Sequence, residues 1–396
     1  MFLLRLLSYF VPFAVNFLQG GFFFITSYRF AEAGCSGVVI GGALTAWGAA
    51  YCLVTMITGR LANISNALKF ILSGGGILTL SSLGFIIFSG VYTQFLWLFT
   101  AGVGAALFCA PFQLFAKSIE SGSNESHGTV WATSFYTMTW SVGFASGPLA
   151  FARLSVRSGF IVTLILSLAV VISVLLIAFR RRNGAGSREC AASDAVAAQA
   201  GQTEYPEKYF TRLAILGWIV GGLGTVTICQ LRSMWPKLGS DLGIARYHVA
   251  YVLALVSYAQ ALTALLLCRS RNWMCRRFPS LLMNVPGIAA LLIFAFAGNT
   301  CCFYLAALLY GIYSGCMYFY LVYHSLAHPV RNSFFVAGNE VIVGVTSMLS
   351  PFIGGMLLDI SGRSNAPFIF AAAVILLALA IQWLILKPGS SSEDRL

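Results

Sequence analysis

The sequence predicts an all-α membrane protein with twelve transmembrane helices in two halves of six. Hydrophobic residues make up 59% of the 396-residue chain and charged residues only 9%, whereas typical soluble domains carry roughly a quarter charged residues. Apolar runs close to the ~20 residues that cross a bilayer recur along the chain. One long polar interval near the middle separates them into two groups. These observations exclude a soluble protein with an appended anchor.

The runs are predicted to be helices, because a segment in lipid must satisfy its backbone hydrogen bonds internally. They also lack the polar and apolar alternation that a membrane β-barrel requires. In the first half the predicted helices are Leu3–Ser27, Gly37–Thr58, Phe70–Val91, Leu96–Lys117, Gly128–Phe151 and Phe160–Phe179. In the second half they are Leu213–Leu231, His248–Cys268, Leu281–Ala297, Thr300–His324, Phe334–Leu358 and Pro367–Leu386. Pro286 and Gly287 interrupt the ninth helix, and the first run is interpreted as a retained helix rather than a signal peptide.

The predicted domains are an N-terminal six-helix bundle (1–180), a polar linker (181–212) and a C-terminal six-helix bundle with a short tail (213–396). The linker's small and charged residues are typical of a flexible tether. A shift of about 209 residues superposes the first four predicted helices of each half, which is the pattern expected of internal repeats. The same shift aligns Glu32 with Asp241, Gly34 with Gly243, Arg60 with Arg269 and Gly102 with Gly311.

The net charge of +12 is interpreted as membrane topology rather than as a nucleic-acid-binding surface. Lysine and arginine favour cytoplasmic loops. If the N-terminus is cytoplasmic, seventeen of the 24 basic residues fall on the cytoplasmic side. We therefore expect a multi-pass protein of the inner or plasma membrane with both termini and the linker in the cytoplasm.

The sequence shows no soluble-type catalytic pattern. Its ten cysteines form no Cys-x-x-Cys pair, its four histidines lack metal-ligand spacing, and no phosphate-binding Gly-x-x-x-x-Gly-Lys-Ser/Thr loop occurs. We expect no enzyme activity, no cofactor and no metal.

Glu340 is the one acidic residue predicted to lie well inside a helix, roughly 10 Å from its start near Ser333. A carboxyl group in the hydrocarbon region is costly and usually functional. Three roles are open: proton coupling, a neutral carboxyl group bonded to a neighbouring helix, or contact with a cationic substrate. His324 is the nearest titratable residue in sequence and is a second proton-coupling candidate, with a simple interfacial role as the alternative.

Polar and aromatic residues recur at helical spacing within several predicted helices. In the middle of a membrane their donors must face a cavity or another helix rather than lipid. A substrate pathway and helix packing both remain open for this set. The substrate-pathway candidates are Asn16, Gln19, Trp47, Tyr51, Tyr136, Trp140, Gln230, Tyr258, Tyr313 and Tyr320.

Arg29 and Arg232 lie near the predicted outer ends of the first and seventh helices. Long basic side chains at such positions usually reach the membrane interface. We expect that role for both arginines, with attraction of an anion as the alternative.

Two local motifs resemble those of the major facilitator superfamily of secondary transporters. The loop from Gly59 to Lys69 keeps the glycine, leucine and alanine of the family's Gly-x-Leu-Ala-Asp-Arg-x-Gly-Arg-Lys motif, but Asn63 replaces the acid. Gly143, Gly147 and Pro148 match the core of a Gly-x-x-x-Gly-Pro motif common in the family's drug and proton antiporters. The glycine spacing is equally typical of close helix packing. The resemblance implies two rocking six-helix halves, with these five positions in gating or helix packing.

From the residues and this resemblance we expect a monomeric secondary transporter that works by alternating access. Its partners are the bilayer, a small organic molecule that is largely neutral or cationic, and protons. Export is our first choice of direction. An uptake carrier for a neutral polar solute such as a sugar or nucleoside is the alternative. Because the loop motif is degenerate, a transport-inactive membrane receptor or assembly component with the same fold stays open as well.

Overall fold

The computed structural model describes residues 2–88, 90–120, 125–183, 207–269, 273, 277–328 and 330–386. In these residues the chain forms only α-helices and the turns that join them. In the first half they are α1 (Phe2–Glu32), α2 (Gly37–Leu61), α3 (Ala67–Ile87), α4 (Gln94–Glu120), α5 (Glu125–Arg153) and α6 (Val156–Asn183). In the second half they are α8 (Glu207–Asp241), α9 (Arg246–Leu267), α10 (Arg277–Leu282), α11 (Asn284–Phe296), α12 (Thr300–Leu326), α13 (Asn332–Ser361) and α14 (Ala366–Ile385). The predicted all-α fold is confirmed.

The ninth predicted helix is broken, as its sequence indicates. α10 and α11 meet at Met283, three residues before Pro286. Proline has no amide hydrogen for the carbonyl group four residues earlier, here that of Leu282, and its ring crowds that carbonyl. The two pieces together form one span, Phe278–Phe296.

Eleven spans in the described chain are long and apolar enough to cross a membrane. α5 is 29 residues long but has no stretch as apolar as these spans. Its polarity has a structural reason, because the buried hydroxyl groups of Ser134 and Ser141 bond to residues of α9. α5 therefore lies inside the bundle, between α1 and α9, and completes the predicted set of twelve.

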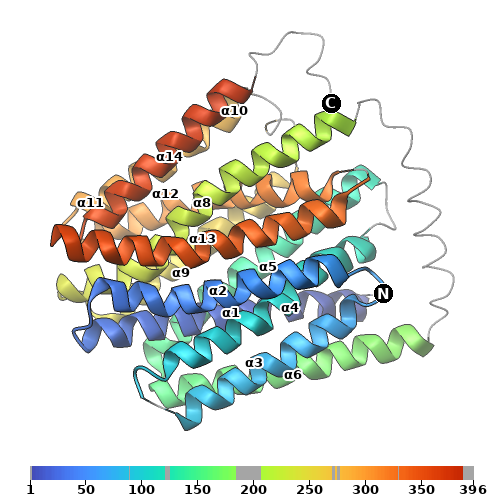
Figure 1. Cartoon of the computed structure of the whole chain (residues 1–396), viewed down its shortest axis with the longest axis horizontal. Helices are drawn as coiled ribbons and strands as arrows, with labels where there is room; N and C mark the ends of the chain where they lie inside the picture. Colours follow the sequence, from blue (N-terminus) through green and yellow to red (C-terminus); the bar gives the residue numbers. More distant parts are fainter. Residues whose placement is uncertain are drawn as a thin grey trace.

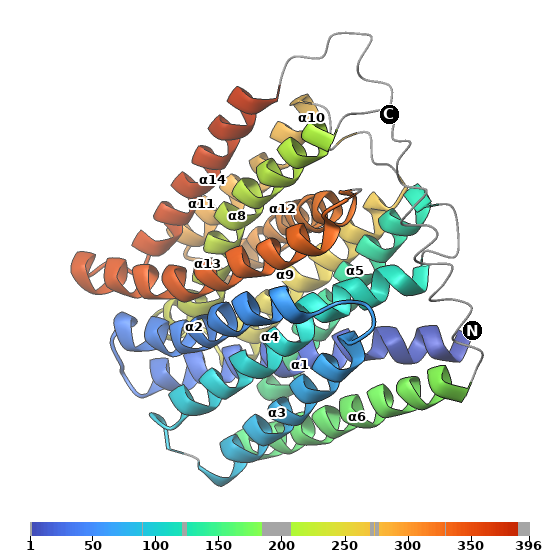
Figure 2. The ribbon, with the colours of Figure 1, turned by 45° about the vertical axis from the view of Figure 1, so that its right-hand side comes forward.

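The helices run side by side along the long axis of the molecule, with α1–α6 in one half and α8–α14 in the other (Figures 1 and 2). α6 ends and α8 begins on the same side, where α1 also begins (Figure 1, right-hand side), and α14 runs toward that side. We call this side the linker face and the other side the far face. Two pairs of helices make the most extensive contacts between the halves: α2 with α13, and α5 with α9. We call these pairs the α2–α13 seam and the α5–α9 seam.

The two halves are structural repeats, and the turn after the first helix of each half shows it. Gly34 follows α1 and Gly243 follows α8, and both adopt the left-handed conformation, with φ of 68° and 66°. In the first turn Gly34 N–H donates to Ala31, and the next amide donates to Phe30. In the second turn the same bonds recur 209 residues later, to Ser240 and Gly239. A glycine is favoured here because it adopts positive φ without a steric cost.

A helix contact repeats at the same spacing. A methyl group on Gly102 would collide with the Trp47 carbonyl group and the Ala50 side chain. A methyl group on Gly311 would collide with the Val256 carbonyl group and the Ala259 side chain, again 209 residues further along. The predicted alignment of the two glycines thus reflects the same close approach between helices in each half.

Candidate functional site

The α2–α13 seam is built from small residues that bring two helix backbones together. A methyl group on Gly41 would collide with the Pro351 carbonyl group, and one on Gly48 would collide with the backbone of Ser347 and Met348. Thr45 Oγ1 donates to the Met348 carbonyl oxygen at 2.7 Å. This seam is closed along its length, from Gly37 near the far face to the linker-face end of α2.

Gly59 and Asn63, predicted as gating residues, lie at that linker-face end. A methyl group on Gly59 would collide with Ala337 of α13, so Gly59 belongs to the seam. The Asn63 Oδ1 atom accepts hydrogen bonds from Ser65 and Asn66 in its own loop, at 2.6 and 3.0 Å. Asn63 therefore shapes the α2–α3 turn, and its described bonds stay within that turn.

The α5–α9 seam is joined by polar contacts instead. Ser134 Oγ donates to the Ala264 carbonyl oxygen at 2.7 Å, and Gln260 donates to Ser141 at 2.6 Å. Nearer the far face the Ser146 and Tyr258 hydroxyl groups lie 3.3 Å apart. Tyr258 is 38% exposed. The structure thus places this predicted pathway residue at the outer edge of a seam.

Glu340 lies between the halves and is buried. Although it belongs to α13, its carboxyl oxygens accept hydrogen bonds from Tyr51 of α2 and Gln113 of α4. Gln113 Nε2 also lies 3.4 Å from the hydroxyl group of Tyr136, and the Cys109 thiol contacts both tyrosines. We call Tyr51, Cys109, Gln113, Tyr136 and Glu340 the carboxyl cluster.

The carboxyl cluster can hold Glu340 in either protonation state. A carboxylate accepts hydrogen bonds from both Tyr51 and Gln113. A protonated carboxyl group must donate one bond, and the tyrosine hydroxyl group can turn to accept it. Glu340 lies eight residues after the start of α13, about 12 Å from the linker-face end of that helix.

His324 lies in a different part of the bundle. It is buried near the linker-face end of α12, with its ring centroid 4.5 Å from that of Tyr320 and its Cβ close to Gly217 of α8. No described hydrogen bond connects His324 to Glu340. The structure therefore does not bring the two predicted proton-coupling residues together.

Two of the predicted aromatic residues form a stack beside the carboxyl cluster. The Trp47 and Tyr51 rings lie 4.8 Å apart at 18°, and Phe23 of α1 packs edge-on against Trp47 at 5.0 Å. Trp140 of α5 packs edge-on against Tyr318 of α12 at 4.9 Å, so this aromatic contact crosses the halves. Trp47, Tyr51, Tyr136 and Trp140 thus all lie near the surface between the halves.

The remaining predicted pathway residues lie elsewhere. Tyr313 packs against Gly287 within the second half, and Tyr320 packs beside Trp273 and His324. Asn16 Nδ2 donates to the Pro12 carbonyl oxygen of its own helix at 2.9 Å. Gln19 and Gln230 are buried, and the Nε2 atom of each has no hydrogen-bond partner among the described residues.

Gly143, Gly147 and Pro148 lie where α5 crosses α1, inside the first half. A methyl group on Gly143 would collide with the Phe13 carbonyl group, and one on Gly147 would collide with Phe17 and Gly21. Pro148 follows in the same helix. The geometry of these residues is that of close helix packing within one half.

Arg232 lines the candidate site, and our expectation that it lies at the membrane interface is wrong. Its side chain is only 8% exposed. The predicted helix stops at Leu231, immediately before Arg232. α8 instead continues to Asp241, about 14 Å beyond Arg232. Arg232 therefore lies well inside a membrane-spanning helix rather than at its end.

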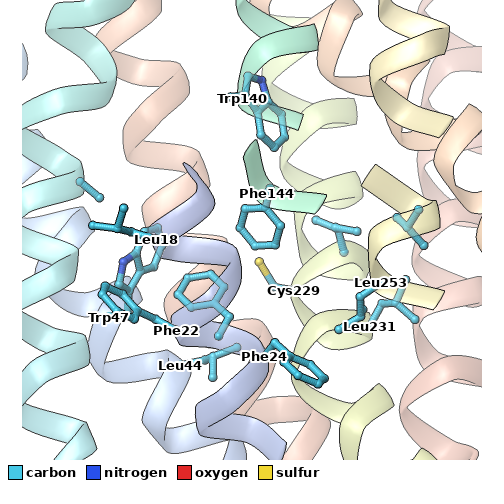
Figure 3. Packing of buried hydrophobic residues seen from close by; sticks show 14 of the residues in the cluster. Leu18, Phe22, Phe24, Leu44, Trp47, Trp140, Phe144, Cys229, Leu231 and Leu253 are labelled. Atoms are coloured by element: carbon cyan, nitrogen blue, oxygen red, sulfur yellow. The ribbon is translucent and has the colours of Figure 1, made fainter. Parts of the chain in front are cut away.

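The guanidinium group of Arg232 lies 3.7 Å from the ring centroid of Phe144 on α5. Its Nη2 atom has no hydrogen-bond partner among the described residues. Phe144 and Cys229 point toward each other in the space between α5 and α8 (Figure 3). A cavity of about 10 Å³ lies here, roughly the space for one water molecule. Its lining is Phe23, Leu44, Trp47, Cys229, Arg232, Ser347 and Pro351.

Gln113 is the residue of this candidate site that sequence reasoning missed, whereas Arg232 was recognised but expected at the membrane interface, with anion attraction as the alternative. An arginine within an apolar stretch indicates a functional site. Arg232 would have met this criterion if the predicted helix had been extended past Pro236. Gln113 lies in a predicted helix and carried no comparable signal, because its role depends on a residue 227 positions away.

Comparisons with known proteins agree with this fold. A family model described as "Major Facilitator Superfamily" matches residues 5–333. The fold is similar to that of the nucleoside transporter NupG, in a point-mutant form, with a TM-score of 0.63 and 13% identity over 97% of this chain and 100% of that chain. It is also similar to the human organic anion transporter MFSD10 (TETRAN), with a TM-score of 0.63 and 13% identity over 95% and 98% of the two chains. No curated protein matches the chain in sequence.

Proposed function

Because this chain belongs to the major facilitator superfamily, whose members are membrane transporters rather than enzymes, we propose that it is a proton-coupled secondary transporter. It moves a small organic molecule by alternating access, with the two halves rocking about the seams. The coupling group is Glu340. The observation that carries this proposal is the hydrogen bonding of Glu340 across the halves, to Tyr51 and Gln113.

The chemistry of coupling follows from the position of Glu340. Its carboxylate accepts two hydrogen bonds from the first half, and these bonds hold the halves together on the linker-face side of mid-depth. A proton on the carboxyl group changes one acceptor into a donor and weakens that tie. Proton binding can therefore bias the equilibrium between closed and open forms, which is what coupling requires.

For orientation, we place the linker face in the cytoplasm, since most basic residues fall on that side. We keep export as the direction, supported by the resemblance of Gly143, Gly147 and Pro148 to the antiporter motif. Uptake of a neutral solute such as a nucleoside is the second candidate. The stacked rings of Trp47 and Tyr51 favour it, because they offer a flat surface to a base or sugar.

The test uses purified protein in liposomes that contain a pH-sensitive dye. Uridine represents neutral solutes and indole-3-acetate represents anions. In the native protein, solute transport should be accompanied by proton movement, opposite to the solute for an exporter of the antiporter type and with the solute for an uptake carrier. Glu340→Gln keeps the size of the side chain and, like a protonated carboxyl group, offers one acceptor and one donor, but it cannot release a proton, so solute-driven proton movement should be abolished.

Asp241→Asn is the matched control, because the described ion pair of Asp241, with Lys237 one turn away, stays on the same helix. It should leave proton movement unchanged. Solute transport that keeps its pH dependence in Glu340→Gln would refute the coupling role. A native protein that binds these solutes but moves none of them would favour the receptor alternative.

A further inference from the structure

Arg232 is a buried positive charge without an acidic partner among the described residues. The described ion pairs join Lys237 to Asp241 and Arg331 to Glu207. The Glu340 carboxyl group accepts hydrogen bonds from Tyr51 and Gln113 and forms no described ion pair with Arg232. An arginine at this depth is costly unless something compensates its charge. The Phe144 ring compensates only part of the Arg232 charge, through a cation–π contact.

The cavity beside Arg232 has an excess of hydrogen-bond donors. Both Arg232 Nη2 and Trp47 Nε1 are buried, belong to residues that line this cavity and have no hydrogen-bond partner in the described chain. The other two polar side chains in the lining, Cys229 and Ser347, bond to each other at 3.3 Å. A ligand that satisfies this wall must bring acceptors, and beside a guanidinium group the best acceptor is an anion.

The shape and origin of the lining point to an organic ligand. Phe23, Trp47 and Pro351 form apolar walls. Trp47 and Phe23 come from the first half, whereas Arg232 comes from the second. A ligand held by both would therefore lie between the halves. In this closed form the cavity is far too small for such a molecule, so a seam must open for it to enter.

We propose that Arg232 binds the carboxylate group of an aromatic organic anion, with Trp47 Nε1 as a second donor and the Phe23 and Trp47 rings against its planar body. This inference rests on the proposed transport function and names its substrate class. It replaces our expectation of a neutral or cationic molecule. A neutral molecule would leave the charge of Arg232 uncompensated, and a cation would add repulsion.

The experiment measures binding rather than transport, so that the two proposals can fail separately. The full-length protein in detergent is heated with indole-3-acetate, or with indole-3-acetamide, which has the same ring and no charge. A ligand that binds only the folded protein raises the unfolding temperature. We expect the acid to raise it and to bind at least roughly tenfold more tightly than the amide, as expected when a charged hydrogen bond is gained.

Three variants make the test specific. Arg232→Gln should weaken acid binding by roughly ten- to a hundredfold, as expected for loss of a charged hydrogen bond, and should remove the preference over the amide. Arg232→Lys keeps the charge and should retain part of the preference, so it serves if the glutamine variant folds poorly. Arg363→Gln removes an arginine from the exposed α13–α14 turn and should bind like the native protein.

The inference is overturned by equal binding of acid and amide, by no binding of either, or by acid binding that survives in Arg232→Gln. It is also overturned if sodium chloride alone produces the whole Arg232-dependent shift, since the bound anion would then be inorganic. Selective acid binding without any transport would uphold this site and refute the transporter proposal instead. Transport of uridine that is unaffected by Arg232→Gln would uphold the transporter proposal and refute the anion site.

Discussion

At the scale of single residues, His328 shows how a buried histidine is kept neutral. Its Nδ1 atom accepts the backbone N–H of Arg331 at 3.0 Å, and its Nε2 atom lies 3.1 Å from the hydroxyl group of Thr211 on α8. The accepted bond requires that Nδ1 carry no proton. Burial lowers the pKa of His328, and the nearby Glu207 opposes this effect while Arg331 adds to it. The neutral ring joins the α12–α13 turn to α8.

This arrangement predicts a pH-dependent stability. Because the pKa of His328 is lower in the folded than in the unfolded protein, its contribution is fully present above the unfolded value of about 6.5. It is lost as the pH falls through the folded value. In acid, the free energy of unfolding of the native protein should therefore fall by about 1 kcal/mol more than that of His328→Gln, whose side chain can make both hydrogen bonds but does not titrate. Thermal unfolding measures this difference.

His248→Gln is the control, since His248 bonds to Tyr304 on the opposite face of the molecule. It should keep the acid sensitivity of the native protein. Equal acid sensitivity in the native protein and in His328→Gln would show that other groups set this pH dependence.

At the scale of helices, glycine positions decide which elements can touch. Gly48 lies on α2 where α13 approaches, and an added methyl carbon would lie 2.5 Å from the Ser347 carbonyl carbon. Backbone atoms cannot move aside as a flexible side chain can. Gly76 on α3 is also helical, but nothing lies within 4 Å of a methyl group placed there.

The same substitution should therefore have opposite effects at these two positions. Gly48→Ala should destabilise the protein by about 1–3 kcal/mol, as expected for overpacking, and should slow transport because the seam no longer closes. Gly76→Ala should be neutral or stabilise by up to about 1 kcal/mol, since alanine is the better helix former. Thermal unfolding in detergent measures both effects. A Gly48→Ala protein as stable as Gly76→Ala would contradict the close contact across the seam.

At the scale of the whole molecule, α13 carries two carboxyl groups that tie the halves together at different depths. Glu340 bonds to Tyr51 and Gln113 toward the linker face. Asp359 accepts the backbone N–H groups of Gly37 and Val38 at the far face, at 2.7 and 2.9 Å. These amides begin α2, where a helix favours negative charge. Alternating access would require the two ties to break in turn.

The far-face tie predicts a change in cysteine accessibility. Asp359→Asn should weaken it by about 1.5–3 kcal/mol, and the molecule should open more often at that face. Maleimide modification of Cys229, which lines the buried cavity, should then become roughly tenfold faster or more. Mass spectrometry measures each cysteine separately, and the exposed Cys301 serves as an internal reference.

Asp241→Asn makes the same chemical change at the same face within a single helix, and it should leave the modification rate of Cys229 unchanged. An unchanged rate in Asp359→Asn would mean that its two hydrogen bonds do not limit opening.

The helices and the repeat could be predicted because their causes are local. Apolar length determines a span, and Pro286 interrupts its helix through its own missing amide hydrogen. Gly34 and Gly243 end equivalent helices because each needs a positive φ at its own position. Glu340 was recognised because a carboxyl group inside an apolar run is unusual wherever the helix lies.

The fold class, the twelve helices, the two repeated halves and the most conspicuous buried acid could all be predicted from the residues. The meeting of Glu340 with Tyr51, 289 residues away, and the position of Arg232 beside Phe144 and Trp47 rather than at the interface emerge only from the packed helices. Membrane helices of similar hydropathy can pack in many rotations and pairings. The contacts that distinguish one arrangement from another, such as a glycine against a backbone or a donor without an acceptor, exist only when the helices are packed together.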